Sequence, residues 1–258
     1  MRGQFIAVAV LAGLLAGCAA EEPTSTQVPA EPDSAMAETQ QEEGELGAQW
    51  GGHKAVVLPP RARVHGRSIT EWTKEWYRWH FRVPADRSPM LLLEQDCGEL
   101  QDDPVFFVPT YDLDTTYQRT CRVPRHKPVL LPLWVIINDF PCPDPDFKPA
   151  PGQTLEDFLR TGAIDFNNGT QDLRVTINGR SVDTRRHRHT SGLFTFDTDP
   201  SLVGKIPDPC LTGGEQQGVT DGWWLMLLLP PGEHVVNVQA LAPFGSPIDF
   251  TYTLRVER

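Results

Sequence analysis

The densest group of potentially reactive side chains is Arg185-Arg186-His187-Arg188-His189. On a strand, His187 and His189 would share one face, and Arg186 and Arg188 would share the other. Arginine binds carboxylates through two parallel hydrogen bonds, so Arg186, His187, Arg188 and His189 are candidate residues for binding an anion or an acidic glycan. Nearby guanidinium groups repel a divalent cation, so we expect no metal site here. The alternative is structural, because charged residues also protect the exposed edge of a strand.

Catalytic motifs do not point to a reaction. The nucleophile-elbow, H-E-x-x-H, P-loop and dinucleotide-binding patterns are all absent from the sequence. Glycoside hydrolysis needs two carboxyl groups, but spacing selects no pair among the scattered candidates Glu71, Glu75, Asp112, Asp114 and Asp139. The sequence therefore leaves enzymatic activity open, favours a non-enzymatic protein and predicts no cofactor.

Four cysteines lie in the body of the chain, and an even number in an exported protein predicts disulfides. Four cysteines allow three pairings. We expect Cys97 to pair with Cys121 around the segment 105–108, and Cys142 to pair with Cys210, because both of the latter lie in Pro- and Asp-rich stretches. A four-cysteine metal site is the disfavoured alternative, because its ligands normally come in close C-x₂₋₄-C pairs.

The N-terminus has the pattern of an export signal. Arg2 precedes an apolar segment over Phe5–Leu15, and Leu15-Ala16-Gly17-Cys18 ends it. A membrane-spanning helix needs roughly 20 apolar residues, so this segment is too short to remain in the bilayer. An ordinary secretory signal that happens to contain a cysteine is the alternative.

The motif Leu15-Ala16-Gly17-Cys18 resembles the lipobox of bacterial lipoproteins. That resemblance implies removal of residues 1–17 and attachment of palmitate-type acyl chains to Cys18, so that membrane lipid is the first partner. Two or three chains give stable attachment, whereas one chain is marginal. By the same resemblance, Ala19 implies the outer membrane if the cell has one.

Residues 18–52 carry eight acidic residues and no Lys or Arg. A segment with one sign of charge and few apolar residues does not bury enough surface to fold, so we expect a disordered acidic tether; binding of a basic partner is an alternative role. The tether accounts for most of the net charge of −11. The remaining body, 53–258, is only mildly acidic and is expected to be a single β-rich domain. Nucleic acid is excluded as a partner, because binding it requires a basic face.

Two helices are predicted. Ser68-Ile-Thr-Glu71 is a capping box that starts the first helix, and Pro84 ends it after Val83. Trp72, Trp76, Trp79 and Val83 lie on one face of this helix, where they form part of a core or, alternatively, a platform for stacking sugars. The second helix is predicted from Thr154 to about Ile164.

Nine apolar or alternating segments predict strands. They are Val56–Leu58, Val105–Val108, Tyr117–Val123, Val129–Ile137, Leu173–Ile177, Leu193–Phe196, Trp223–Leu229, Val235–Ala240 and Phe250–Val256. Asn178-Gly179 predicts a hairpin to the short segment 180–182, and Pro230-Pro231-Gly232 predicts a turn that makes the last three strands a meander. The expected fold is mainly β: an antiparallel two-sheet sandwich of Ig-like or jelly-roll type with two peripheral α-helices.

The body also resembles an uncharacterised family of exported bacterial proteins, through the motifs over Gly66–Trp72, Cys97–Pro124 and Asp221–His234. This resemblance implies no known activity. Together these patterns predict a lipid-anchored protein of the cell envelope, outside the cytoplasm, with a non-enzymatic binding or scaffolding role toward an envelope glycan or another envelope protein. The alternative function is a secreted hydrolase that acts on envelope polysaccharide or peptide.

Overall fold

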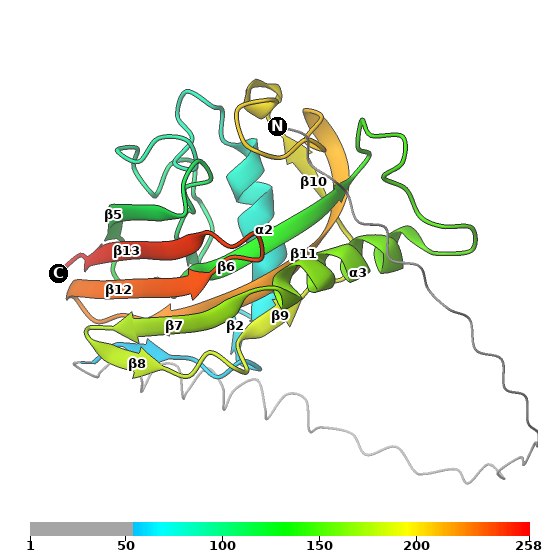
Figure 1. Ribbon diagram of the computed structural model, residues 1–258. Helices are drawn as coiled ribbons and strands as arrows, with labels where there is room; N and C mark the ends of the chain where they lie inside the picture. The colour runs from blue at the N-terminus through cyan, green and yellow to red at the C-terminus, as the bar shows by residue number, and fades with distance from the viewer. Residues whose placement is uncertain (1–53) are drawn as a thin grey trace, which may run out of the picture.

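The computed structural model describes residues 54–258, which form a mainly β structure with two α-helices (Figure 1). The predicted lipidation site Cys18, the predicted signal segment and the predicted tether lie outside the described residues. Two large sheets share one hydrophobic core, and α2 (Ile69–Arg82) covers the other face of the larger sheet. Within residues 54–258, no helix is long and apolar enough to cross a membrane.

The strands form a six-stranded sheet, a five-stranded sheet and a small hairpin. The six-stranded sheet contains β1 (Val56–Val57), β4 (Phe106–Phe107), β6 (Val129–Phe140), β9 (Arg188–Thr190), β10 (Phe194–Thr198) and β11 (Gly214–Leu228). The five-stranded sheet contains β5 (Thr116–Val123), β7 (Gln171–Ile177), β8 (Arg180–Val182), β12 (Gly232–Leu241) and β13 (Pro247–Val256). The remaining elements are the β2 (Arg63–Val64) and β3 (Arg67–Ser68) hairpin, α3 (Leu155–Asn168) and the 3₁₀ turn η1 (Pro200–Leu202).

The long strand β11 organises the six-stranded sheet. One of its edges pairs with β6 over most of its length, and its other edge pairs in turn with β10, β9 and β1. Both faces of β11 are buried, one against α2 and the other against the five-stranded sheet. A strand that is covered on both faces reads as a continuous apolar run, which explains the sequence of its second half.

The prediction that β11, β12 and β13 form a meander is wrong for its first pair. β12 pairs with β13 and β7, and it makes no ladder with β11. Because β11 already has partners on both edges, the Pro230–Gly232 turn carries the chain from one sheet to the other. The hairpin at Asn178-Gly179 is confirmed, and both residues have positive φ (52° and 74°), as a type I′ turn requires.

Antiparallel pairing holds for most ladders but is wrong for two of them. β4 pairs with β6 in parallel, and β5 pairs with β13 in parallel. Each parallel pair joins strands that are not consecutive in the chain, so no tight turn dictates their direction. The prediction of two large β-sheets that share a core is confirmed.

The first helix starts and ends as predicted, but it is not peripheral. Ser68 Oγ accepts a hydrogen bond from the Glu71 N–H at 3.2 Å, and Val83 is the C-cap. The predicted aromatic face is buried, with Trp72, Trp76 and Trp79 each at most 2% exposed. The adjacent face is buried as well. α2 therefore lies within a core of its own, packed against the face of the six-stranded sheet that points away from the five-stranded sheet. Core packing, and not sugar stacking, accounts for these rings.

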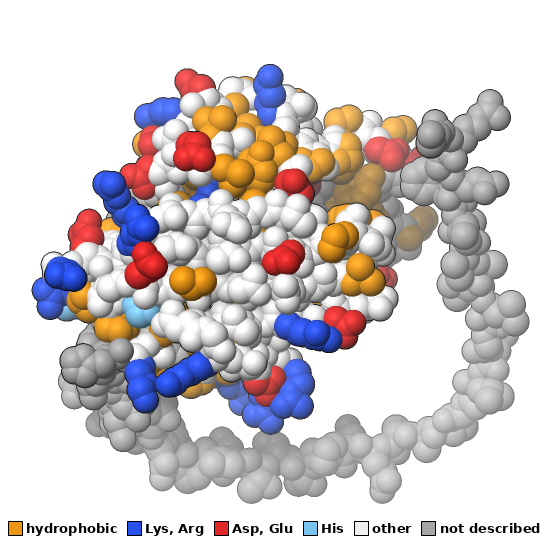
Figure 2. All heavy atoms as spheres, turned by 60° about the vertical axis from the view of Figure 1, so that its left-hand side comes forward, with side chains coloured by type: hydrophobic (Ala, Val, Ile, Leu, Met, Phe, Trp, Pro, Cys, Tyr) orange, Lys and Arg blue, Asp and Glu red, His pale blue; other side chains and the backbone are white. Residues whose placement is uncertain are grey.

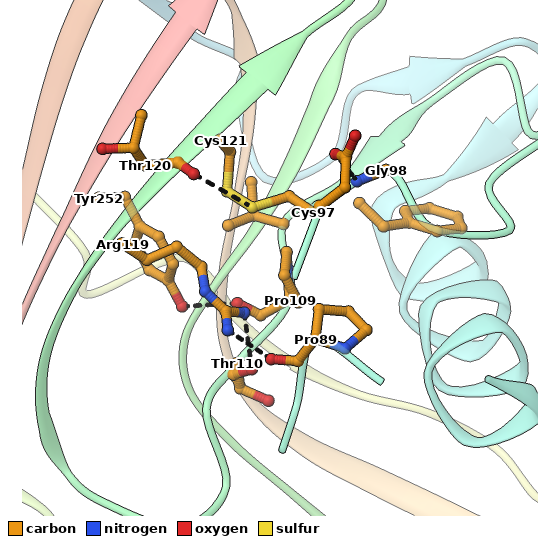
Figure 3. The surroundings of a disulfide bond; sticks show 12 residues. Pro89, Cys97, Gly98, Pro109, Thr110, Arg119, Thr120, Cys121 and Tyr252 are labelled. Carbon is orange, nitrogen blue, oxygen red and sulfur yellow. Dashed lines mark hydrogen bonds between the residues drawn. A yellow bond between two sulfur atoms is a disulfide. The ribbon is translucent and has the colours of Figure 1, made fainter. Parts of the chain in front are cut away.

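Both predicted disulfides are present, Cys97–Cys121 and Cys142–Cys210. The first joins the long segment between α2 and β5 to β5 itself (Figure 3). Beside it, the buried Arg119 side chain donates to the carbonyl oxygens of Pro89 at 2.5 Å and Thr110 at 3.4 Å (Figure 3). These bonds hold the α2–β5 segment in place, including residues 110–115, which line the pocket described below.

Candidate functional site

The residues that the sequence selected for anion binding do not point to one place. Arg186 is exposed, whereas His187 and His189 are buried, at 7% and 8% exposure. His189 Nδ1 lies 3.1 Å from Thr70 Oγ1 of α2, on one side of β9. Arg188 points to the other side, where it donates to the Ile164 carbonyl of α3 at 2.9 Å. The expected alternation of faces is therefore present, and it separates these side chains.

Arg188 is held in a structural ion pair. It lies 2.7 Å from the carboxylate of Asp221, which is fully buried on β11. Thr190 Oγ1 and Asn167 Nδ2 also donate to this carboxylate, at 2.6 and 3.0 Å. The network joins β9, β11 and α3, so the Arg188 guanidinium has a structural partner in place of a ligand.

The two histidines of this segment are held neutral. Burial, with a smaller contribution from the neighbouring His187, lowers the pKa of His189 to about 4. Burial also lowers the pKa of His187. A neutral imidazole has no charge with which to attract an anion, so the structure offers no support for this cluster as an anion site.

A pocket of about 360 Å³ opens instead beside the middle of β6. Its walls are the C-terminal half of α2, residues 110–115 and the loop 206–208, and Phe244 and Phe250 close the side toward the five-stranded sheet. The volume lies within the range of small-molecule sites.

Pro132 marks the point where pairing along one edge of β6 ends, next to the pocket. β4 pairs with β6 only at Val129 and Leu130. Pro132 has no N–H to donate to the Val108 carbonyl, which accepts from Trp76 Nε1 at 2.8 Å instead. Within residues 54–258, no strand pairs with this edge of β6 beyond that point, and the pocket lies there.

A β-bulge turns β6 toward the pocket. Trp223 lies opposite Trp134, and the register shifts before Trp224, which leaves Leu133 as the extra residue. Bulges are frequent beside functional sites because they re-aim side chains. Gly222 permits the close approach of β11 here: its φ is +153°, and an added Cβ would lie 2.4 Å from the Trp134 carbonyl oxygen.

His80 and Asp112 form a polar group on one wall. His80 is 2% exposed and stacks on the ring of Trp76, with centroids 4.0 Å apart. Its Nε2 lies 3.4 Å from Asp112 Oδ2 and 3.2 Å from Thr110 Oγ1. Because the Thr110 hydroxyl donates to Asp112 Oδ1 at 2.5 Å, His80 Nε2–H is the donor to both residues. His80 Nδ1 is buried and has no hydrogen-bond partner among the described residues.

Asp208, on the opposite wall, is paired with the buried Asp139. Asp139 is 2% exposed and accepts a hydrogen bond from Gln216 Nε2 at 2.6 Å. Its carboxylate lies within 4.8 Å of that of Asp208. Burial raises the pKa of Asp139 to about 8, with Asp208 adding to the effect, and burial also raises the pKa of Asp208. At neutral pH the pair therefore holds about one proton and one negative charge.

Cys210 Sγ lies in the same 4.8 Å group, but it is bonded to Cys142. A disulfide sulfur is not a thiolate, so two carboxyl groups that share a proton are left as ligand atoms, and this set does not suit a metal ion. The role of the disulfide is to hold the 206–210 loop, and Asp208 with it, against the end of β6.

Aromatic rings form the remaining wall. Tyr117 stacks on Phe250 with centroids 5.0 Å apart, and Tyr111 meets Tyr117 edge-on at 5.7 Å. Trp134 contacts Phe244 at 6.3 Å, and Phe244 is 59% exposed at the rim. Figure 2 shows one face of the molecule, on which hydrophobic side chains gather near the top with acidic side chains beside them.

Sequence reasoning named Asp112, Asp114 and Asp139 among scattered carboxylates but missed His80 and Asp208. A signal for the Asp139–Asp208 pair was present, because each residue lies two or three positions before a cysteine of the predicted second disulfide. No comparable signal connects His80 on a helix to Asp112 in a loop. Glu71 and Glu75 are outside the pocket: Glu71 caps α2, and Glu75 pairs with arginines.

Comparison with known proteins adds no functional information. No protein-family model matches the chain, and neither a curated protein nor a solved structure is significantly similar to it. The pocket is therefore the basis of the proposals that follow.

Proposed function

We propose that this protein is a lipid-anchored binding protein of the cell envelope, and that its ligand enters the pocket beside β6. The pocket itself carries the proposal. Its walls are mainly apolar and aromatic, with a few polar groups that converge from different elements, as is usual for sites that bind small molecules. The ligand would be an envelope component, such as part of a glycan or of another protein. We also propose that the two large sheets form a sandwich of Ig-like or jelly-roll type.

A blocking variant tests the pocket. Ile136 is a half-buried pocket residue of β6, so Ile136→Trp should fill the space. Val235→Trp is the matched control, because Val235 is 39% exposed on β12 and does not line the pocket. Each protein is dialysed against a small-molecule extract of the envelope, and the retained compounds are identified by mass spectrometry. Compounds kept by the wild type and the control but lost by Ile136→Trp would support the proposal.

Equal retention by all three proteins would refute a ligand site in this pocket. Far-ultraviolet circular dichroism and the urea-unfolding midpoint of the two variants must match those of the wild type, so that loss of binding reflects a filled pocket and not a misfolded chain.

The cellular location has separate support. The two disulfides indicate an oxidising compartment outside the cytoplasm. Attachment through acylated Cys18 would place the body at a membrane surface, with residues 18–52 as the tether. Metabolic labelling with a clickable fatty acid should mark the wild type and not Cys18→Ser, and the variant should move from the membrane fraction to the soluble fraction. An unlabelled wild type would contradict lipid anchoring.

A hydrolase is the second candidate. One observation favours it: Asp112 and Asp208 line the same pocket in different environments. Asp208 shares a proton with Asp139, whereas Asp112 accepts hydrogen bonds, and such a pair can divide the roles of acid and base. Turnover of chromogenic glycosides or peptides that is lost in both Asp112→Asn and Asp208→Asn would favour the enzyme over the binding protein.

A further inference from the structure

We propose that the ligand of this pocket is an organic cation: a primary ammonium group on an apolar or aromatic body. This inference rests on the proposed function, since it names the ligand class for the same pocket. The ammonium group would lie between Asp112 and Asp208, and the body would lie along Trp134 and Phe244.

The first argument for a cationic ligand is the charge of the residues that line the pocket. Three acidic side chains line the pocket, Asp112, Asp114 and Asp208, and no Lys or Arg is among the lining residues. A carboxylate or phosphate ligand would meet repulsion from several sides without a balancing cation. A cationic ligand would gain from each of these groups, and more strongly than in water, because the apolar walls lower the local dielectric constant.

The second argument is the position of the two carboxylates, Asp112 and Asp208. Asp112 comes from the α2–β5 segment and Asp208 from the loop held by the second disulfide, so they approach the pocket from separate elements. Both carboxylates line the same pocket, and the negative charge of Asp112 contributes to the raised pKa of Asp208. A cation between them would relieve this repulsion. A primary ammonium group has three N–H donors, which suits two carboxylates and one further acceptor.

The third argument is a buried nitrogen atom that has no hydrogen-bond partner in the described part of the chain. His80 lines the same wall as Asp112, is 2% exposed, and has a buried Nδ1 without a partner among the described residues. With its proton on Nε2, the imidazole of His80 has an acceptor at Nδ1, and an ammonium N–H is a donor that suits it.

The aromatic rings carry the last step. Cations are attracted to the faces of Trp, Tyr and Phe, and the pocket has such rings on more than one wall. Phe244 and Leu113 at the rim are 59% and 51% exposed, so they offer apolar surface to a ligand. An apolar body attached to the ammonium group would cover them. A simple inorganic cation would gain nothing from the apolar rim, so this combination of acidic and aromatic groups favours an organic cation.

Three probes of similar size and different charge test the proposal: 2-phenylethylammonium, 2-phenylethanol and 3-phenylpropionate. Binding to the whole chain is followed by tryptophan fluorescence and by the NMR signal of the Trp134 indole N–H. The ammonium should bind about tenfold to hundredfold more tightly than the alcohol, because a charge-assisted hydrogen bond replaces a neutral one. The carboxylate should bind weakest.

The variants Asp112→Asn and Asp208→Asn should each weaken binding of the ammonium by about tenfold or more, while binding of the alcohol is unchanged. Asp172→Asn is the matched control, because it removes one negative charge at an exposed position outside the pocket and should leave all three affinities unchanged.

The outcomes separate this inference from the proposed function. If the alcohol binds as tightly as the ammonium, or if the carboxylate is preferred, the cation inference is wrong while the pocket is still a binding site. If none of the probes shifts the Trp134 signal, the cation inference is overturned, and the comparison with Ile136→Trp judges the pocket independently.

Discussion

Replacing Asp139 by Asn should change how the stability of this protein depends on pH. Burial raises the pKa of Asp139 to about 8 in the folded protein, against 3.8 for an ordinary aspartate. The folded state therefore holds a proton that the unfolded chain releases. This contribution to stability is fully present below about pH 4 and is lost as the pH rises toward 8. Asparagine is neutral throughout and keeps the acceptor for Gln216 Nε2.

The expected magnitude follows from one extra proton in the folded state. Relative to Asp139→Asn, the stability of the wild type should fall by about 1.4 kcal/mol per pH unit, so roughly 3 kcal/mol between pH 5 and pH 7. The lowered pKa values of His187 and His189 act in the opposite direction, because the unfolded chain then holds more protons. They are common to both proteins and cancel in the difference.

The assay is urea unfolding of both proteins at several values between pH 5 and pH 8, without reductant so that the disulfides stay closed. Asp208→Asn is the internal control. Burial, not the neighbouring charge, is the largest cause of the raised pKa of Asp139, so this variant should reduce the slope only in part. Identical slopes for the wild type and Asp139→Asn would refute the assignment of a buried, protonated carboxyl group.

Three further variants test the packing around the site, each by urea unfolding. Arg188→Met leaves the buried Asp221 carboxylate without its partner and should cost about 3 to 5 kcal/mol. Gly222→Ala should cost about 1 to 3 kcal/mol or more, because its Cβ would lie 2.4 Å from the Trp134 carbonyl oxygen at a φ that favours glycine. Trp76→Ala should cost about 3 to 5 kcal/mol, because the ring is buried and its Nε1 donates to the backbone.

Arg186→Ala is the control for this set, because Arg186 is exposed and should change stability by about 0.5 kcal/mol or less. If Arg188→Met were as mild as Arg186→Ala, the ion pair with Asp221 would not be structural, and the original interpretation of the Arg186–His189 cluster as a binding site would regain support. A stable Gly222→Ala variant would contradict the close approach of β11 and β6 at the bulge.

Several parts of the fold could be predicted because their causes are local. The capping box at Ser68–Glu71, the end of α2 at Val83 and the hairpin at Asn178-Gly179 each depend on residues within a few positions of one another. α3 was predicted four residues too short, because Asp165–Asn168 resembles a turn in isolation and becomes helical where Asn167 bonds to Asp221. Sheet partners were not predictable in this way. The turn after β11 does not reveal that both edges of β11 already pair with other strands.

The candidate site was harder still. The sequence selected Arg186–His189 because charged residues are dense there, but density along the chain does not show which face each side chain occupies. β9 sends Arg188 toward α3 and His189 toward α2, and both meet partners in the core. The pocket residues are few in any one stretch, and they meet only after α2, β6 and two loops have packed.

The amino-acid sequence by itself determined both ends of α2, its aromatic face and the tight turn at Asn178-Gly179, because these depend on short spacings. For the four body cysteines it left three pairings, and the one that we expected is present. Tertiary structure alone decided the sheet partners, the bulge at Leu133 and the placement of Asp112 and Asp208 around one pocket. The physical reason is that a strand edge is open or closed according to what other segments have already bonded to it. β4 stops pairing with β6 before Pro132, and no other described strand pairs with that edge of β6 beyond this point. The pocket lies beside this unpaired edge.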